Sequence, residues 1–298
     1  MKIPGTSDRG AIDDRRGRRA GGIPGGVAIP IGGAGGCGGL IILLLILFLG
    51  GGQIIGGGLA PADESVDGGF GGVRPGRAPA SGRAPDPDAP TVELVRFVVN
   101  DLNAYWADSF RASGRQYTPA RLVLFEDVTQ SGCGGAEAAV GPHYCPSDGQ
   151  VYLDLSFFRE LERRFGAPGD FAQAYVIAHE YGHHVQNVTG VLGQVARLQQ
   201  QNPSRANDLQ VRVELQADCL AGAWANSVYR QGLLESGDLE EGLNAAAAVG
   251  DDRLQRQATG RINPETWTHG SAEQRSRWFR AGFQSGSPET CNTFRGSP

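Results

Sequence analysis

The stretch that decides the fold is Ala174-Tyr175-Val176-Ile177-Ala178-His179-Glu180-Tyr181-Gly182-His183-His184-Val185. Its apolar residues fit a buried helix, which we expect to run from about Asp170 to Val188 with Asp170 as its N-cap. Within this helix lies His-Glu-x-x-His at 179–183. Positions four apart on a helix lie about 40° from each other, so both imidazoles project from one face toward one ion.

The residues around these histidines predict a catalytic zinc site. Glu180 lies about 100° round the helix, where it can reach a water on the ion without binding the ion itself. Such a site needs a third protein ligand and one open position. Downstream, Glu214 and Asp218 are four residues apart and share one helix face. We expect His179, His183 and Glu214 to bind one Zn²⁺. Asp218 would accept a hydrogen bond from the outer nitrogen of a ligand histidine; the alternative is a solvated acidic pair.

The remaining pattern predicts a mainly α fold with a small β-sheet, an α+β fold. Further helices are expected at about 92–110, 157–165, 191–201, 205–231, 238–257 and 270–282. Strands are expected at 122–128 and 151–155, just before the central helix.

The N-terminal part of the chain has a different composition. No charged residue occurs from Ala20 to Ala62, and this stretch contains the apolar run Leu40–Leu49. With its flanks the run reaches about 20 residues, the length that a bilayer requires. We therefore expect a single transmembrane helix at 36–58.

This span divides the chain into four parts. A basic tail and Gly-rich approach occupy 1–35, and a Gly/Pro-rich linker at 59–90 leads from the span to one domain at 91–298. The basic side of a span stays in the cytoplasm, so the domain is expected outside it. Cleavage of a signal peptide at Ala60-Pro61-Ala62 and a buried core helix are the alternatives. The net charge of −5 gives no support to a nucleic-acid partner.

Several segments together resemble one protein family. They are 129–133, 144–146, 152–158, 179–186, 214–219, 269–271, 274–275 and 277–279. In these residues the chain resembles the bacterial neutral zinc metallopeptidases, a membrane-anchored, gluzincin-like family with two histidine ligands and a glutamate ligand. The resemblance covers about residues 91–296, together with the order of tail, span and linker. It implies a zincin-like domain that hydrolyses peptide bonds of a peptide or protein substrate, with Glu180 as general base.

The other histidines receive different expectations. The resemblance implies that His269 stabilises the oxyanion as a neutral donor, since peptidases of this kind place a donor there; packing at a helix start is the alternative. His184 points about 140° away from His179 and is expected to be structural. His143 is expected in an exposed loop.

The cysteines fit an oxidising compartment. Cys133 and Cys145 bracket a Gly/Ala-rich loop, and closing it would remove about 3 kcal/mol of unfolded-state entropy. We expect that bridge in an exported domain. Cys219 and Cys291 are candidates for a second bridge; otherwise Cys219 is a buried thiol.

Two other classes of function stay open. One is a zinc hydrolase with a non-peptide substrate, and the other is a non-catalytic membrane partner stabilised by zinc. Glu180 argues against the second, because structural zinc needs no general base. By analogy with other zinc peptidases, the strand at 151–155 is expected to be a sheet edge that pairs with extended substrate.

Overall fold

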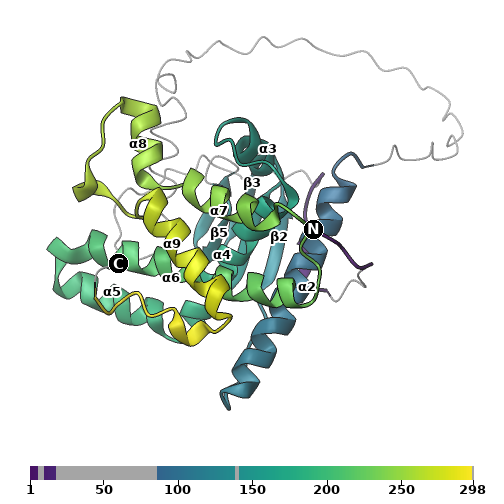
Figure 1. The fold of residues 1–298 in the computed structure, drawn as a ribbon, viewed down its shortest axis with the longest axis horizontal. Helices are drawn as coiled ribbons and strands as arrows, with labels where there is room; N and C mark the ends of the chain where they lie inside the picture. The colour runs from purple at the N-terminus through teal and green to yellow at the C-terminus, as the bar shows by residue number, and fades with distance from the viewer. Residues whose placement is uncertain (6–9, 18–85, 138–140, 297–298) are drawn as a thin grey trace, which may run out of the picture.

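The computed structural model describes residues 1–5, 10–17, 86–137 and 141–296 (Figure 1). They form a mainly helical chain with a small sheet, which confirms the predicted α+β class. The helices are α2 (Ala89–Ala112), α3 (Ser156–Arg163), α4 (Asp170–Val188), α5 (Val191–Gln201), α6 (Ala206–Arg230), α7 (Asp238–Ala248), α8 (Asp251–Thr259) and α9 (Ala272–Ser285). The strands are β1 (Ile12–Asp14), β2 (Arg121–Phe125), β3 (Val128–Ser131), β4 (Gly134–Glu137), β5 (His143–Cys145) and β6 (Gln150–Asp154).

The predicted span at 36–58 lies outside the described residues. Across the ranges that the structure does describe, we find no helix with both the length and the apolar character that crossing a membrane requires.

The main sheet has the strand order β1-β2-β6-β5. β1 and β6 flank β2 in parallel, and β5 pairs antiparallel with β6. β3 and β4 form a separate two-stranded sheet. The expectation that the strand at 151–155 is an edge is therefore wrong, because β6 has a partner on each side. The neighbouring edge strand is β5, whose three residues are too short to give a recognisable alternating pattern.

β1 comes from the region that the sequence assigned to a separate tail. Ile12 pairs with Leu122, and Asp14 pairs with Leu124. The guanidinium of Arg16 bonds Asp14 and also Asp86, just before α2, at 2.9 Å. The described part of 1–35 thus contributes a strand to the domain, which corrects the boundary placed at residue 91. A three-residue strand gains its stability from a distant partner, so local pattern did not reveal it.

α4 forms the centre of the molecule and packs against α2, α5, α6, α7 and the strands β5 and β6 (Figure 1). Nearly every side chain from Phe171 to Gln186 is buried. Its bounds agree with the prediction, except that Gly169 and not Asp170 is the N-cap.

The helix predicted at 238–257 is two helices, α7 and α8, separated at Val249 and Gly250. A side chain at Gly250 would collide with the backbone of Ala272, so the chain passes close to the start of α9 at this point. The break lets Asp251 begin α8 with its carboxylate facing the loop before α9.

Candidate functional site

Three buried side chains from α4 and α6 converge on one point. The Nε2 atom of His179 lies 3.2 Å from Oε2 of Glu214, and Nε2 of His183 lies 3.6 Å from the same oxygen. The potential ligand atoms of all three residues lie within 4.8 Å of one another. These are the residues that the sequence proposed as metal ligands, and their arrangement is one that could hold an ion.

The outer nitrogens of both histidines have acceptors. Nδ1 of His179 lies 2.9 Å from Oδ1 of Asp218, and Nδ1 of His183 lies 2.9 Å from Oε1 of Gln186. A hydrogen on each Nδ1 leaves the Nε2 lone pair directed at the convergence point, which is the tautomer that a metal ligand requires. The donor set therefore fits a tetrahedral metal ion with an open fourth position.

Charge also favours a cation here. Burial alone would raise the pKa of Glu214, but His183 and His179 hold it well below its usual range. Burial would lower the pKa of His179, yet Asp218 and Glu214 raise it to about 9. Without a metal ion, a proton bound to His179 thus balances the negative charge of the buried carboxylates of Asp218 and Glu214.

The close approach of α4 and α6 depends on Gly182. A Cβ atom placed there would lie 2.9 Å from Cα of Ala217. Any side chain at 182 would therefore force the two helices apart. The glycine between the two histidines lets Glu214 and Asp218 reach them from the facing helix.

Asp218 is the centre of a buried polar network. Its carboxylate accepts hydrogen bonds from Tyr175 Oη at 2.5 Å, from Arg275 Nε at 2.8 Å and from Arg275 Nη2 at 2.9 Å. Burial would raise the pKa of Asp218, but Arg275 and His179 lower it. The guanidinium keeps Asp218 ionised and fixed behind His179.

Tyr175 and Arg275 received no role in the sequence analysis. Tyr175 stands four residues before His179, on the same helix face, and this spacing was an available signal. Arg275 lies on α9, and nothing local to it indicates that its side chain reaches Asp218.

His269 lines the same cavity as His179 and is held by Asp251. Its Nδ1 lies 3.1 Å from Oδ1 of Asp251. The other carboxylate oxygen accepts the backbone N–H groups of Thr268, His269 and Gly270 at 2.7, 2.7 and 3.1 Å. The hydroxyl of Thr268 also lies 3.1 Å from Nδ1, so Asp251 and Thr268 together fix the orientation of the ring. Asp251 was missed because it begins α8 but acts on the loop before α9, 17 to 19 residues further along the chain.

The remaining histidines lie away from this point. His184 bonds Tyr144 Oη through Nδ1 and the Thr118 carbonyl through Nε2, at 3.1 and 2.7 Å. Its side chain therefore ties α4 to neighbouring segments. The expectation of an exposed loop for His143 is wrong, since it is buried in β5 and stacks on Tyr152 with ring centroids 5.3 Å apart. Its cross-strand pairing with Tyr152 explains the burial.

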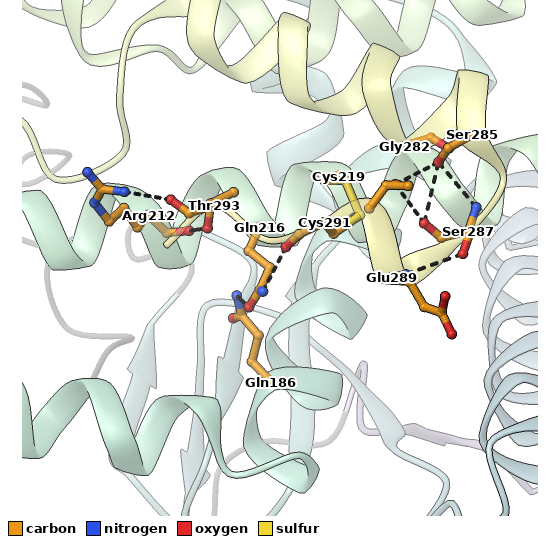
Figure 2. The surroundings of a disulfide bond; sticks show 11 residues. Gln186, Arg212, Gln216, Cys219, Gly282, Ser285, Ser287, Glu289, Cys291 and Thr293 are labelled. Carbon is orange, nitrogen blue, oxygen red and sulfur yellow. Dashed lines mark hydrogen bonds between the residues drawn. A yellow bond between two sulfur atoms is a disulfide. The ribbon is translucent and has the colours of Figure 1, made fainter. Parts of the chain in front are cut away.

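Both predicted disulfides are present. Cys133–Cys145 ties the β3–β4 turn to the end of β5, and Cys219–Cys291 ties α6 to the C-terminal segment. Figure 2 shows the second bridge with Gln186 and Gln216 beside it. The amide of Gln216 donates to the Cys291 carbonyl at 2.8 Å. The bridge follows Asp218 directly in the chain and thereby braces the helix that presents Glu214.

A cavity of about 320 Å³ opens beside the convergence point. His179, Glu180 and His269 form one part of its wall, together with Tyr175 and Arg275. Glu180 and His269, the two predicted catalytic residues, therefore line the same cavity as His179.

Comparison with known proteins gives relatives without an established activity. The chain is 53% identical over 190 residues to "Uncharacterized protein YpfJ" of Escherichia coli strain K12, covering 63% of this chain and 66% of that protein, slightly less than two thirds of its length. It is 48% identical over 206 residues to "Uncharacterized protein Mb2605" of Mycobacterium bovis, covering 65% of this chain and 68% of that protein. No solved structure matches significantly.

The comparison with protein families is more informative. The family described as "Putative neutral zinc metallopeptidase" matches residues 1–294, which include β1 as well as every residue of the site. The match covers nearly the whole chain of 298 residues. With its two histidines and a glutamate converging between α4 and α6, the chain belongs to this zinc metallopeptidase family.

Proposed function

We propose that the protein is a zinc-dependent metallopeptidase that hydrolyses peptide bonds at the cavity beside His179. The observation that carries the proposal is the pairing of a ligand set with a separate carboxylate. His179, His183 and Glu214 converge on one point, while Glu180 lines the adjoining cavity. A site that served stability alone would need the three ligands but not an acid–base group facing a substrate-sized space.

The residues of the site would have three roles in peptide hydrolysis: binding the metal, transferring a proton and stabilising the oxyanion. Zinc held by His179, His183 and Glu214 would supply a water of lowered pKa and polarise the substrate carbonyl. Glu180 accepts the proton of the attacking water and passes it to the leaving amine. His269, held by Asp251, donates from Nε2 to the oxygen on which negative charge develops.

Export of the domain is a further part of the proposal; because β1 pairs with β2, residues 12–14 must be exported with the domain, so a single crossing at 36–58 is not part of it. Two disulfides support an oxidising compartment, because cytosolic thiols are kept reduced. A reporter enzyme fused after Pro298 should be active only outside the cytoplasm. Cytoplasmic activity of that reporter would contradict export. The zincin-like classification of the fold likewise stays a prediction.

The decisive experiment measures metal and hydrolysis on the same preparation of the full chain. Zinc content is determined first, followed by cleavage of casein, short peptides and cell-wall fragments. Glu180→Gln is the matched control, since it keeps the size of the side chain and removes its basicity. It should retain about one zinc per chain and lose cleavage. Hydrolysis confined to glycosidic bonds of the cell-wall fragments would exclude peptidase activity, and full cleavage by Glu180→Gln would exclude Glu180 as the base.

A further inference from the structure

The cavity beside the catalytic residues has a second, apolar part. Its wall there is built from α3, the turn after it, α4, the α7–α8 junction and α8. The side chains concerned are Phe157, Phe165, Val176, Val249, Leu254 and Ala258. Apart from Val176, all of them keep some contact with solvent. A concave apolar surface of this kind favours a ligand that removes it from water.

The two arginines on the wall, Arg164 and Arg275, are already paired. Arg164 bonds Glu160 at 3.0 Å, and Arg275 is held by Asp218. Neither guanidinium is available to attract an acidic group without giving up its partner. Both its surface and its electrostatics therefore suit a neutral apolar side chain.

We propose that this cavity selects substrates with a large apolar side chain, aromatic or branched aliphatic, at the residue next to the cleaved bond. The inference rests on the proposed function. His179, Glu180 and His269 share the cavity with the apolar wall, so a carbonyl held at the convergence point has its neighbouring side chain within reach of that wall. The volume of about 320 Å³ accommodates a whole phenylalanine or leucine side chain.

Ala258 is the position at which selectivity can be changed. It lies on α8, is exposed and has the smallest side chain of the apolar wall. Replacing it by a larger residue fills the cavity from its open side, without disturbing the packed core. Arg256 is a matched control, because it is exposed on the same helix, about 200° round from Ala258, and does not line the cavity.

The test uses the full chain and quenched fluorescent peptides that differ only at one of the two positions flanking the cleaved bond. At one position, Phe or Leu should give a kcat/KM about 10- to 100-fold above Ala, the range expected from burying such a side chain. Asp at the same position should give a lower kcat/KM than Ala. In Ala258→Phe the ratio of kcat/KM for Phe over Ala should fall to about one. In Arg256→Leu this ratio should be unchanged. If peptides with Phe, Leu and Ala are cleaved with equal kcat/KM at each of the two positions, the apolar selectivity is overturned. The proposed peptidase function is then unaffected.

If no peptide is cleaved, a binding measurement tests the selectivity of the cavity separately from the proposed peptidase activity. Glu180→Gln is titrated with N-acetyl-phenylalaninamide and N-acetyl-alaninamide. The first should bind at least tenfold more tightly, and Ala258→Phe should abolish the difference. Selective binding of the phenylalanine compound without hydrolysis of any peptide would support the apolar selectivity of the cavity. It would contradict the proposed peptidase activity. Equal binding would reject the apolar selectivity. Melting temperatures of the variants show that each is folded, and the comparison of peptides on the unaltered chain needs no variant at all.

Discussion

The side-chain amides of Gln186 and Gln216 bond to each other at 3.0 Å, joining the helix of the two histidines to the helix of Glu214 (Figure 2). Gln186 accepts from His183 through its oxygen and donates through its nitrogen to Gln216 and to the Val213 carbonyl. On the far side, Gln216 donates to the Cys291 carbonyl. A continuous set of hydrogen bonds thus runs from His183 to the Cys219–Cys291 disulfide.

The first prediction concerns Gln186. Gln186→Leu removes the acceptor behind His183, so the imidazole is no longer held in the tautomer that binds metal. Zinc affinity, measured by competition with a chelator, should fall about 10- to 100-fold. Gln216→Leu leaves the His183–Gln186 bond in place and should have a smaller effect. Equal affinities in Gln186→Leu and the unaltered chain would show that Gln186 does not position the ligand.

The second prediction concerns Asp218, which holds His179 in its metal-binding tautomer as Gln186 holds His183. Asp218→Asn keeps the size of the side chain but weakens its acceptance from Nδ1 of His179 and leaves Arg275 without its counter-charge. We expect zinc affinity to fall about 10- to 100-fold and stability to fall as well, because a buried charge loses its partner. Chelator competition and denaturant unfolding measure the two effects. Arg111→Ala, an exposed arginine of α2, should change neither.

The Asp251–His269 pair gives a catalytic prediction. His269→Ala should lower kcat by about 10²- to 10³-fold, the cost of losing an oxyanion donor, with zinc content unchanged. Asp251→Asn should lower kcat too, because the amide holds the His269 ring and the backbone N–H groups around it less firmly than the carboxylate does. Zinc loss in His269→Ala would indicate a ligand. A lower melting temperature with normal kcat would indicate packing alone.

The pH dependence of zinc binding follows from His179. Without metal, Asp218 and Glu214 overcome the effect of burial and raise the pKa of this imidazole to about 9. The protonated form predominates below that pH, and a metal ion must displace the proton. Apparent zinc affinity should therefore rise with pH, about tenfold per unit for each proton displaced, and level off above about pH 9. Metal titrations from pH 6 to 10 measure the slope, and an affinity independent of pH would contradict the assignment.

The ligand set was predictable because it depends on local spacing. His179 and His183 are one helical turn apart, as are Glu214 and Asp218, and the bounds of α4, α5 and α6 follow from apolar periodicity. The supporting residues were not predictable in this way. Asp251 and Arg275 act on residues of another helix or loop, and their roles depend on how helices cross. Gln186 lies three residues after His183 on the same helix, but its other partners, Val213 and Gln216, lie on α6.

The parts of the fold that were missed have a related cause. β1 and β5 are three residues long and are stabilised by pairing with β2 and β6. The break between α7 and α8 reflects the close approach of Gly250 to α9, in a stretch whose own helical pattern continues. Each feature is set by a contact between segments far apart in the chain, which a single sequence does not display.

The pairing of β1 with β2 restricts how this chain can be arranged about a lipid bilayer. Strands that exchange backbone hydrogen bonds occupy the same aqueous compartment, so Ile12 and Leu122 lie on the same side. One crossing that left residues 1–35 inside and the metallopeptidase domain outside would separate the two strands.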